Sequence, residues 1–490
     1  MAARDLLATQ TLGRLYWLRM FRRAVFSVAI FLSIAAVAQE KNPSASLSEV
    51  RPGELSPKVA CAAQPEQSYA LYLPANYTSA KTWPIVYAFD PAARGDLPVE
   101  LMKDAAEHFG YIVVGSNNSR NGPSQAEAEA AQAMFADTHT RFAIDNHRVY
   151  LAGFSGGARL AASLAQRCRC AAGVFLNGAG FSVSSPPVAE NKFAVFSAVG
   201  TLDFNYPEVV SLDAKLASLQ YPHHLRRFEG PHQWAPSNAA DEALAWFRLI
   251  SMKEGREPRD ASFIEAQAAQ ELRRARDLET SSDAYAAWQE YRQAAATFDN
   301  LGETQAFRER AIAMESEKHV RDGAKREQQD FATQARLTAD ISQGLFDLRE
   351  DSTSRAEIRA RLARQIADLR SIAQHEKNPR QSCVFHRALS DVFVQAMEAG
   401  EDRLRSKDYS HACDYFGAAT NADPDSFWAL SNLAVARALA GGRKGALQTL
   451  GIAKQKAQDD AAFAAWLGNE PAFSKLRETP EFRALLGSSP

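Results

Sequence analysis

Residues 153–157 read Gly-Phe-Ser-Gly-Gly and lie directly between the apolar run RVYLA and the helical pattern ARLAASLAQR. A serine at a turn from strand to helix holds its hydroxyl above the sheet, and glycines flank it because a Cβ there would collide with the neighbouring strand or helix. The N–H of Gly156 and the positive end of the helix point into the same space. The pattern predicts that Ser155 is a nucleophile and that Gly156 donates a hydrogen bond to a developing oxyanion.

A serine hydroxyl becomes a good nucleophile when a histidine removes its proton and an acid orients that histidine. Asp203 follows the apolar run FAVFSAVG, and His232 follows the run HLRRFEG. His223 and His224 stand at the start of that second run, which is the wrong end of a strand for this chemistry. We therefore predict a catalytic triad of Ser155, His232 and Asp203.

Alternating strand and helix patterns between residues 66 and 250 are expected to position these side chains. The alternation predicts an α/β fold, a doubly wound and mostly parallel sheet, with ligands bound beyond the carboxyl ends of the strands. Arg94, Asn117 and Arg120 also follow strands and are candidate substrate contacts. The expected strands cover 68–74, 83–90, 111–118, 148–155, 171–180, 193–200 and 224–230, and the expected helices cover 98–109, 125–142, the segment after 155, 207–219 and 238–251.

The segment from about Tyr69 to Leu249 resembles an α/β-hydrolase, and the stretch FAIDNHRVYLAGFSGGARLA is similar to secreted esterases of the polyhydroxybutyrate depolymerase and feruloyl esterase type. The order Ser, Asp, His along the chain agrees with that resemblance. The resemblance implies that Ser155 is the nucleophile, His232 the general base and acid, and Asp203 the acid that holds the imidazole.

The second oxyanion donor of such enzymes comes from the loop after the strand WPIVYAFD. This chain reads DPAARG there in place of the usual His-Gly, and because Pro91 has no N–H, Ala92 is the expected donor beside Gly156. Only the segment FSVSSPPVAENK stands where many lipases insert a cap. An uncapped site should be open to solvent, which disfavours a long-chain lipase.

From about residue 261 to the end the pattern is helical, without a convincing strand. Over residues 381–490 an interval of thirty-four residues relates similar positions and resembles tetratricopeptide repeats, although the tryptophan and tyrosine of the full pattern are missing. Such repeats imply a possible protein partner in their concave surface. The helical stretches of residues 256–380 cannot be aligned to a repeat of this length. The repeating positions are Ala412, Phe416 and Ala419 against Ala446, Leu450 and Ala453, with Gly400 against Ala434.

The N-terminal residues 1–38 are expected to be a signal peptide. Two arginines precede the apolar run AVFSVAIFLSIA, which ends in the small-residue pattern Ala36-Val37-Ala38. We therefore expect an exported protein, periplasmic or secreted, without a stable membrane span, whose translation starts at Met1 or Met20. An uncleaved anchor is the alternative. The mature chain would comprise a catalytic domain at 39–255, the helical region 256–380 and the repeats at 381–490.

Composition limits the other functional classes. The 490 residues carry a formal net charge of −2, so the sequence has no excess of positive charge that would favour nucleic-acid binding. Cys168-Arg169-Cys170 is too tight for a zinc pair, so neither a metal site nor a cofactor is expected. Any disulfide should join Cys61 to Cys168 or Cys170. Two other cysteines, Cys383 and Cys413, lie on successive antiparallel helices and should be reduced and buried.

These observations predict an exported serine hydrolase that cleaves carboxylic esters through an acyl-enzyme. One alternative is a serine peptidase on the same fold, against which the lack of an acidic pair for a peptide amine counts. The other is a repeat-based protein-binding module whose hydrolase domain is a scaffold. Residues 39–255 carry their own sheet and triad, so this segment is expected to fold alone and to cleave small esters.

Overall fold

The computed structural model describes residues 50–487 apart from 123, 282, 303 and 350–353. The predicted signal peptide, residues 1–38, lies outside the described residues. In the part of the chain that is described, no helix is both long enough and apolar enough to cross a bilayer.

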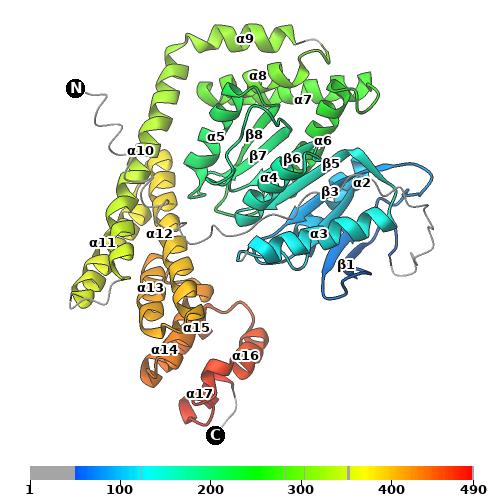
Figure 1. Cartoon of the computed structure of the whole chain (residues 1–490). Coiled ribbons are helices and arrows are strands. Elements are labelled where there is room, and N and C mark those ends of the chain that lie inside the picture. The colour runs from blue at the N-terminus through cyan, green and yellow to red at the C-terminus, as the bar shows by residue number, and fades with distance from the viewer. Residues whose placement is uncertain (1–49, 123, 282, 303, 350–353, 488–490) are drawn as a thin grey trace. The chain divides into compact units, whose positions relative to one another are not determined.

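The described residues form an eight-stranded sheet in the order β1-β2-β4-β3-β5-β6-β7-β8. β1 and β2 run antiparallel to their neighbours, and the pairs from β4 to β8 are parallel. β5 lies in the middle of the sheet (Figure 1). It ends directly before Ser155, so the serine follows the carboxyl end of a central strand. The strands are β1 Leu55–Ala60, β2 Ser68–Tyr72, β3 Trp83–Phe89, β4 Ile112–Ser116, β5 Ile144–Phe154, β6 Gly173–Asn177, β7 Ala194–Gly200 and β8 His223–Phe228.

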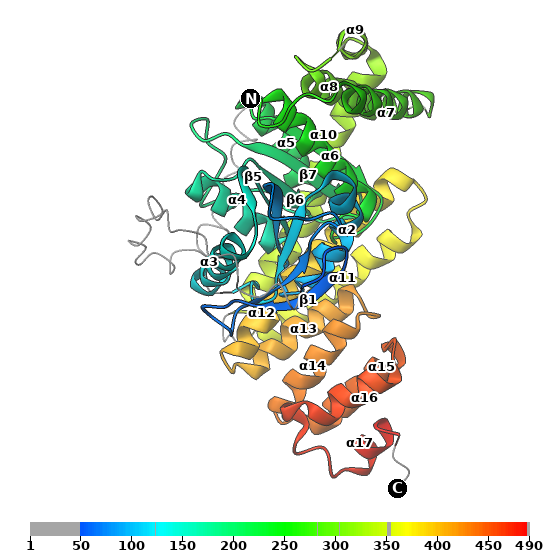
Figure 2. The same cartoon turned by 90° about the vertical axis from the view of Figure 1, so that its right-hand side faces the viewer.

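Helices cover both faces of this sheet (Figure 2). On one face α2 (Asp96–Phe109) and α6 (Ser237–Lys253) bury small and apolar side chains, among them Val99, Met102 and Phe247. On the other face lie α3 (Ser124–Arg141), α4 (Gly156–Cys168) and α5 (Tyr206–Ser218). The fold class predicted from the sequence, an α/β fold with a doubly wound and mostly parallel sheet followed by a helical region, is confirmed.

β1 was not expected from the sequence. Its residues LSPKVA contain a proline and a lysine, and only Val59 within it is buried. It pairs on one side with β2 and forms the edge of the sheet, where proline and charged residues are tolerated.

The predicted disulfide from Cys61 to Cys168 or Cys170 is wrong, because Cys168 bonds to Cys170. α4 ends at Cys168, and the left-handed Arg169 returns the chain so that the two Cα atoms lie 5.1 Å apart. Cys61 stays a buried thiol, and burial together with the charge of Asp137 raises its pKa to about 11. Cys383 and Cys413 are free thiols as expected, but both are partly exposed.

The rest of the described chain is helical, as predicted (Figure 1). Side chains of Asp260, Asp283, Asp408 and Ser426 cap the first turns of the helices that follow them. The helices are α7 Ala261–Thr280, α8 Ala284–Phe298, α9 Gln305–Glu315, α10 Lys318–Asp347, α11 Arg355–His375, α12 Pro379–Arg405, α13 Tyr409–Ala422, α14 Phe427–Leu439, α15 Arg443–Lys456, α16 Asp460–Asn469 and α17 Pro480–Leu485, with a short 3₁₀ turn at Pro471–Phe473.

The repeating positions of the C-terminal sequence are core positions. α12 packs on α13, and α14 packs on α15. Gly400 faces the ring of Phe416 so closely that a Cβ would come within 2.6 Å of it. The equivalent small and large positions are fully buried as well: Ala412, Ala419, Ala434, Ala446, Leu450 and Ala453.

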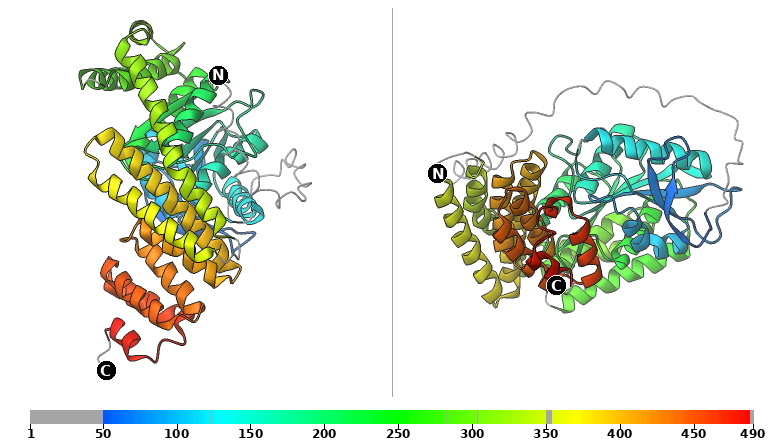
Figure 3. Two further views of the ribbon diagram at one scale, coloured as in Figure 1. Left: turned by 90° about the vertical axis from the view of Figure 1, so that its left-hand side faces the viewer. Right: turned by 90° about the horizontal axis from the view of Figure 1, so that it is seen from below.

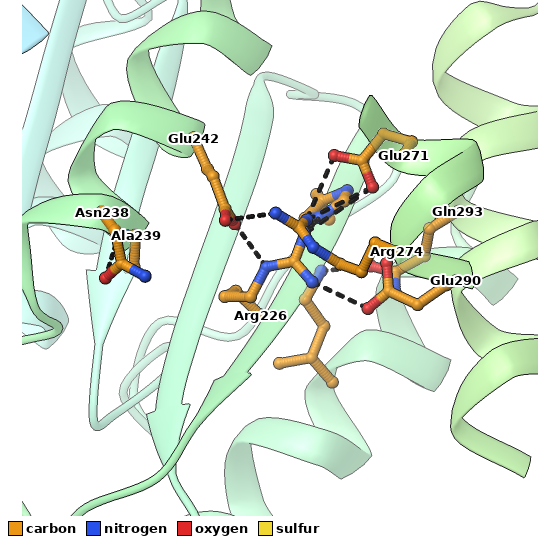
Figure 4. A network of polar contacts seen from close by, with 10 residues as sticks. Arg226, Asn238, Ala239, Glu242, Glu271, Arg274, Glu290 and Gln293 are labelled. Carbon is orange, nitrogen blue, oxygen red and sulfur yellow. Dashed lines mark hydrogen bonds and ion pairs between the residues drawn. The ribbon is translucent and has the colours of Figure 1, made fainter. Parts of the chain in front are cut away.

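A buried polar network joins the sheet to the helices that follow it (Figure 4). Arg226 of β8 donates to Glu242 of α6 at 2.5 Å and lies 3.8 Å from Glu271 of α7. Arg274 of α7 also binds Glu242. Beside this cluster the backbone N–H of Leu225 donates to the side chain of Gln293 on α8. The edge strand β8 is therefore partnered by side chains from α7 and α8.

Candidate active site

Ser155 sits at a sharp turn between β5 and α4. Its backbone has φ 52° and ψ −118°, a conformation in which L-residues are strained, and its N–H donates to Asn177 O at 2.9 Å. The flanking glycines allow the tight packing of this turn. A Cβ on Gly153 would lie 2.1 Å from the carbonyl oxygen of Gly157, and a Cβ on Gly157 would lie 2.0 Å from the carbonyl oxygen of Phe89.

The three residues predicted as a triad lie together at the carboxyl ends of their strands. His232 Nε2 is 3.0 Å from Ser155 Oγ, and His232 Nδ1 is 2.9 Å from both carboxylate oxygens of Asp203. Asp203 is fully buried, and its Oδ1 also accepts from the Asn205 N–H at 2.8 Å. The imidazole is therefore in contact with a hydroxyl on one side and an acid on the other.

Two phenyl rings pack against the imidazole. The ring of Phe154 has its centroid 4.6 Å from that of His232, and the ring of Phe204 has its centroid 4.4 Å away. Gly178, with φ 61°, leaves the space in which the acid and the base meet. A Cβ on Gly178 would lie 2.8 Å from Asp203 Oδ2 and 3.2 Å from the His232 ring.

The two predicted oxyanion donors differ in their surroundings. Gly156 is the first residue of α4, where backbone N–H groups have no partner within the helix. The Ala92 N–H instead donates to Asp90 Oδ1 at 2.8 Å, so it already has a hydrogen-bond partner. The side-chain amide of Asn121 stands against Gly156, and its Oδ1 would lie 1.9 Å from a Cβ on that glycine.

Asp90 organises the loop after β3. It is fully buried and accepts hydrogen bonds from the Arg94 side chain at 2.9 Å and from the Trp234 indole at 2.8 Å. Burial would raise the pKa of Asp90, but the hydrogen bonds from Arg94, Trp234 and Ala92 outweigh burial and lower it. Trp234 lies two residues after His232, so this carboxylate links the loop after β3 to the loop of the base.

The polar residues after β4 have different surroundings. Asn117 donates to Pro57 O at 3.1 Å, and Asn118 accepts from Ser68 N at 2.8 Å, so both amides hold the edge of the sheet. Arg120 has an exposed side chain, and its backbone forms an isolated bridge with Ala92.

Charged side chains from α4, α5 and α12 interact with one another or with His232. Arg159 of α4 forms a two-pronged ion pair with Glu208 of α5, at 2.8 and 2.9 Å. Glu398 of α12 has an exposed side chain, and the loss of part of its hydration together with the neighbouring acids of α12 raises its pKa. The charges of Arg159 and His232 act in the opposite direction, so Glu398 lies within electrostatic range of the base.

Several residues of this arrangement were not identified from the sequence. Asn177 and Gly178 lie in the segment NGAG directly after β6, a polar and glycine-rich strand end that could have indicated them. Phe204 follows Asp203, but no sequence pattern shows that its ring faces the histidine. Asn121 follows a strand as Asn117 does, and nothing in the sequence separates the two.

Comparison with protein-family models and with curated proteins gave no match. Solved structures similar to the chain include the S-formylglutathione hydrolase FrmB of Staphylococcus aureus, with 15% identity and a TM-score of 0.35 over 40% of this chain and 98% of that one. An esterase of Pyrobaculum calidifontis has 14% identity and a TM-score of 0.34 over 41% and 87%. A ferulic acid esterase has 16% identity and a TM-score of 0.31 over 36% and 88%.

Proposed function

We propose that this protein is a serine hydrolase that cleaves carboxylic esters. The observation that carries the proposal is the unbroken line of contacts from Ser155 Oγ to His232 Nε2 at 3.0 Å and from His232 Nδ1 to Asp203 at 2.9 Å. These are the distances at which an imidazole can take the hydroxyl proton while a carboxylate holds its other nitrogen.

In the proposed reaction Ser155 Oγ attacks the ester carbonyl carbon as its proton passes to His232 Nε2. The carbonyl oxygen becomes an oxyanion, which collapses to an acyl-enzyme while the imidazolium gives its proton to the leaving alcohol. Water then attacks the acyl carbon with His232 as base, and the carboxylic acid leaves as Ser155 regains its proton. Asp203 keeps the imidazole oriented and stabilises its positive charge during both steps.

We propose the Gly156 N–H and the Asn121 carboxamide as the two oxyanion donors. Gly156 supports this role because its N–H is the first of α4, where the helix adds a partial positive charge. Asn121 supports it because its side-chain amide stands against Gly156, with the donor Nδ2 3.0 Å from the position that a Cβ on that glycine would take. Side-chain amides serve as oxyanion donors in other hydrolases.

Labelling with a fluorophosphonate probe tests the function. The Ser155 oxygen would displace fluoride and form a phosphonyl ester, and mass spectrometry of the digested protein would locate it. We expect a single adduct on the peptide that contains Ser155, and none in Ser155→Ala. A folded wild-type protein that gave no adduct, and no turnover of short p-nitrophenyl esters, would refute the hydrolase proposal.

A serine peptidase is a second candidate, and the charge interaction between Glu398 and His232 favours it. The sequence offered no acidic pair for a peptide amine, whereas the charge of His232 acts to lower the pKa of Glu398, which brings this carboxylate within electrostatic range of the base. If the protein is a peptidase, aminoacyl p-nitroanilides with a free amine should be cleaved and Glu398→Gln should raise their KM. Cleavage of esters without cleavage of any such anilide would favour the esterase.

We further propose that the protein is exported and that its C-terminal helices are tetratricopeptide-like repeats that bind a protein partner. The disulfide between Cys168 and Cys170 supports an oxidising compartment. The burial of the small and large repeat positions supports the repeat register. N-terminal sequencing of protein recovered from an export-competent host should show cleavage after Ala38.

A further inference from the structure

The loop that carries Asp203 is held first by its own sheet. The Thr201 N–H donates to Phe228 O at 2.9 Å, and the Leu202 N–H donates to Gly230 O at 2.9 Å. These two bonds fix the point at which the loop leaves β7. They act on the chain before the acid and not on the residue that follows it.

Two side chains of the helical region bind the carbonyl groups on either side of the acid. Gln334 of α10 donates from Nε2 to Phe204 O at 2.8 Å, and Arg387 of α12 donates from a terminal nitrogen to Thr201 O at 3.1 Å. α10 and α12 pack against each other, and both long helices can be followed in Figure 3. Together they contact the backbone of the acid loop from outside the sheet.

The two side chains are also bound to each other. Arg387 Nε donates to Gln334 Oε1 at 2.9 Å, and its guanidinium lies 4.6 Å from the centroid of the Tyr206 ring. Arg387 is 4% exposed and Gln334 is 5% exposed. Burying a guanidinium that donates to an amide and a carbonyl is costly. An apolar side chain would fill the same space without that cost, so packing alone does not account for an arginine here.

We propose that Arg387 and Gln334 are positioning residues that keep the Asp203 carboxylate within hydrogen-bond distance of His232, an inference that rests on the proposed hydrolase function. Phe204 provides a second connection between the helical region and His232, because its carbonyl accepts from Gln334 while its ring lies against the imidazole. A shift of the loop by about 1 Å would disturb both contacts, and misplacement on that scale can cost about a hundredfold in rate. In this arrangement the helical region is a working part of the active site.

Two substitutions in the full-length protein test the inference, with a matched control. Arg387→Met removes the donors but keeps the length of the side chain, and Gln334→Leu is the milder change. Arg380→Met is the control, because Arg380 pairs with Asp330 at 2.7 Å between the same two helices without contacting the acid loop. We expect kcat for a short ester to fall about 10- to 100-fold in the first two variants and less than twofold in the control, with KM little changed.

A double-mutant cycle separates positioning from a general loss of stability. If Arg387 acts through the Asp203 carboxylate, Arg387→Met should reduce kcat much less in a protein that already carries Asp203→Asn. Equal losses in both backgrounds, in variants that melt at wild-type temperature, would show that Arg387 acts elsewhere and would overturn the inference.

The proton on His232 Nδ1 provides a readout that needs no turnover. In the wild type its hydrogen bond to Asp203 should give a downfield proton resonance in the NMR spectrum, absent from His232→Ala. We expect this resonance to weaken or shift in Arg387→Met and to stay unchanged in Arg380→Met. An unchanged resonance in folded Arg387→Met would refute the positioning role, whereas a missing Ser155 adduct in the wild type would refute the hydrolase proposal instead.

Discussion

Arg226 of β8 and Glu290 of α8 form a 2.8 Å ion pair in which 9% and 11% of the two side chains are exposed. α8 lies beyond residue 255, where the sequence predicted the catalytic domain to end. The last strand of the sheet therefore has a buried charged partner in the helical region.

A fragment that ends at residue 255 should be markedly less stable than one that ends at about residue 301. The shorter fragment loses Glu271 and Glu290 as partners of Arg226 and exposes to water the side chains that α7 and α8 cover. Thermal unfolding and gel filtration of fragments 39–255 and 39–301 would measure the difference. Equal melting temperatures and monomeric behaviour for both would support the shorter, sequence-based boundary.

Asp203→Asn should keep the fold but reduce the turnover of short p-nitrophenyl esters by about 10⁴-fold, because an amide holds the imidazole in the wrong tautomer. His232→Ala should abolish turnover, and adding Ser155→Ala to it should cost little more. Asp213→Asn is the control. Asp213 lies 3.7 Å from His223, the first residue of β8, whereas His232 follows the opposite end of that strand. Near wild-type activity of Asp203→Asn would mean that another carboxylate serves the base.

Asn121→Ala should lower kcat by about 10²- to 10³-fold with little change in KM, because loss of one oxyanion donor removes a bond made mainly in the transition state. The neighbouring Arg120→Ala provides the control for local disturbance. Steady-state kinetics on acetyl and butyryl esters would distinguish them. If both variants retained wild-type kcat, a backbone N–H of the loop after β3 would have to supply the second donor.

Asp391→Asn should stabilise the protein more at pH 8 than at pH 5. Burial raises the pKa of Asp391 from 3.8 to about 6, and the hydrogen bond from Gln395 offsets this only in part. The folded state therefore binds the proton more tightly than the unfolded state, and the contribution of this group to stability is lost as pH rises through about 6.

The increase in the free energy of unfolding caused by Asp391→Asn should be about 1 kcal/mol larger at pH 8 than at pH 5, since one pKa unit corresponds to about 1.4 kcal/mol. Urea unfolding at the two pH values would measure it. Asp340→Asn, at an exposed position of α10, is the control and should change stability equally at both. The same pH dependence in both variants would contradict the burial of Asp391.

Local sequence patterns were sufficient to predict most of the sheet and the residues that meet above it. Ser155, Asp203 and His232 each follow an apolar strand, and parallel strands bring their carboxyl ends to one edge. β1 was missed because an exposed edge strand has little apolar pattern. The Cys168–Cys170 bond depends on one left-handed residue between the cysteines, which no periodicity reveals.

The contacts of the helical region with the acid loop could not be predicted. Gln334 and Arg387 lie 130 and 186 positions from the residues whose carbonyls they bind. In the sequence each is one polar residue on a helix rich in charge, and its burial depends on how α10 and α12 pack. The same holds for Asn121, whose place beside Gly156 depends on the path of an irregular loop.

Phe154 and Phe204 are the immediate chain neighbours of the nucleophile and of the acid, and both of their rings pack against the imidazole. The His232 imidazole packed in this way cannot rotate by half a turn without breaking both aromatic contacts and its hydrogen bond to Asp203. The nitrogen that accepts the proton of Ser155 must therefore also deliver it to the departing alcohol, so the proton follows one back-and-forth path during each catalytic cycle.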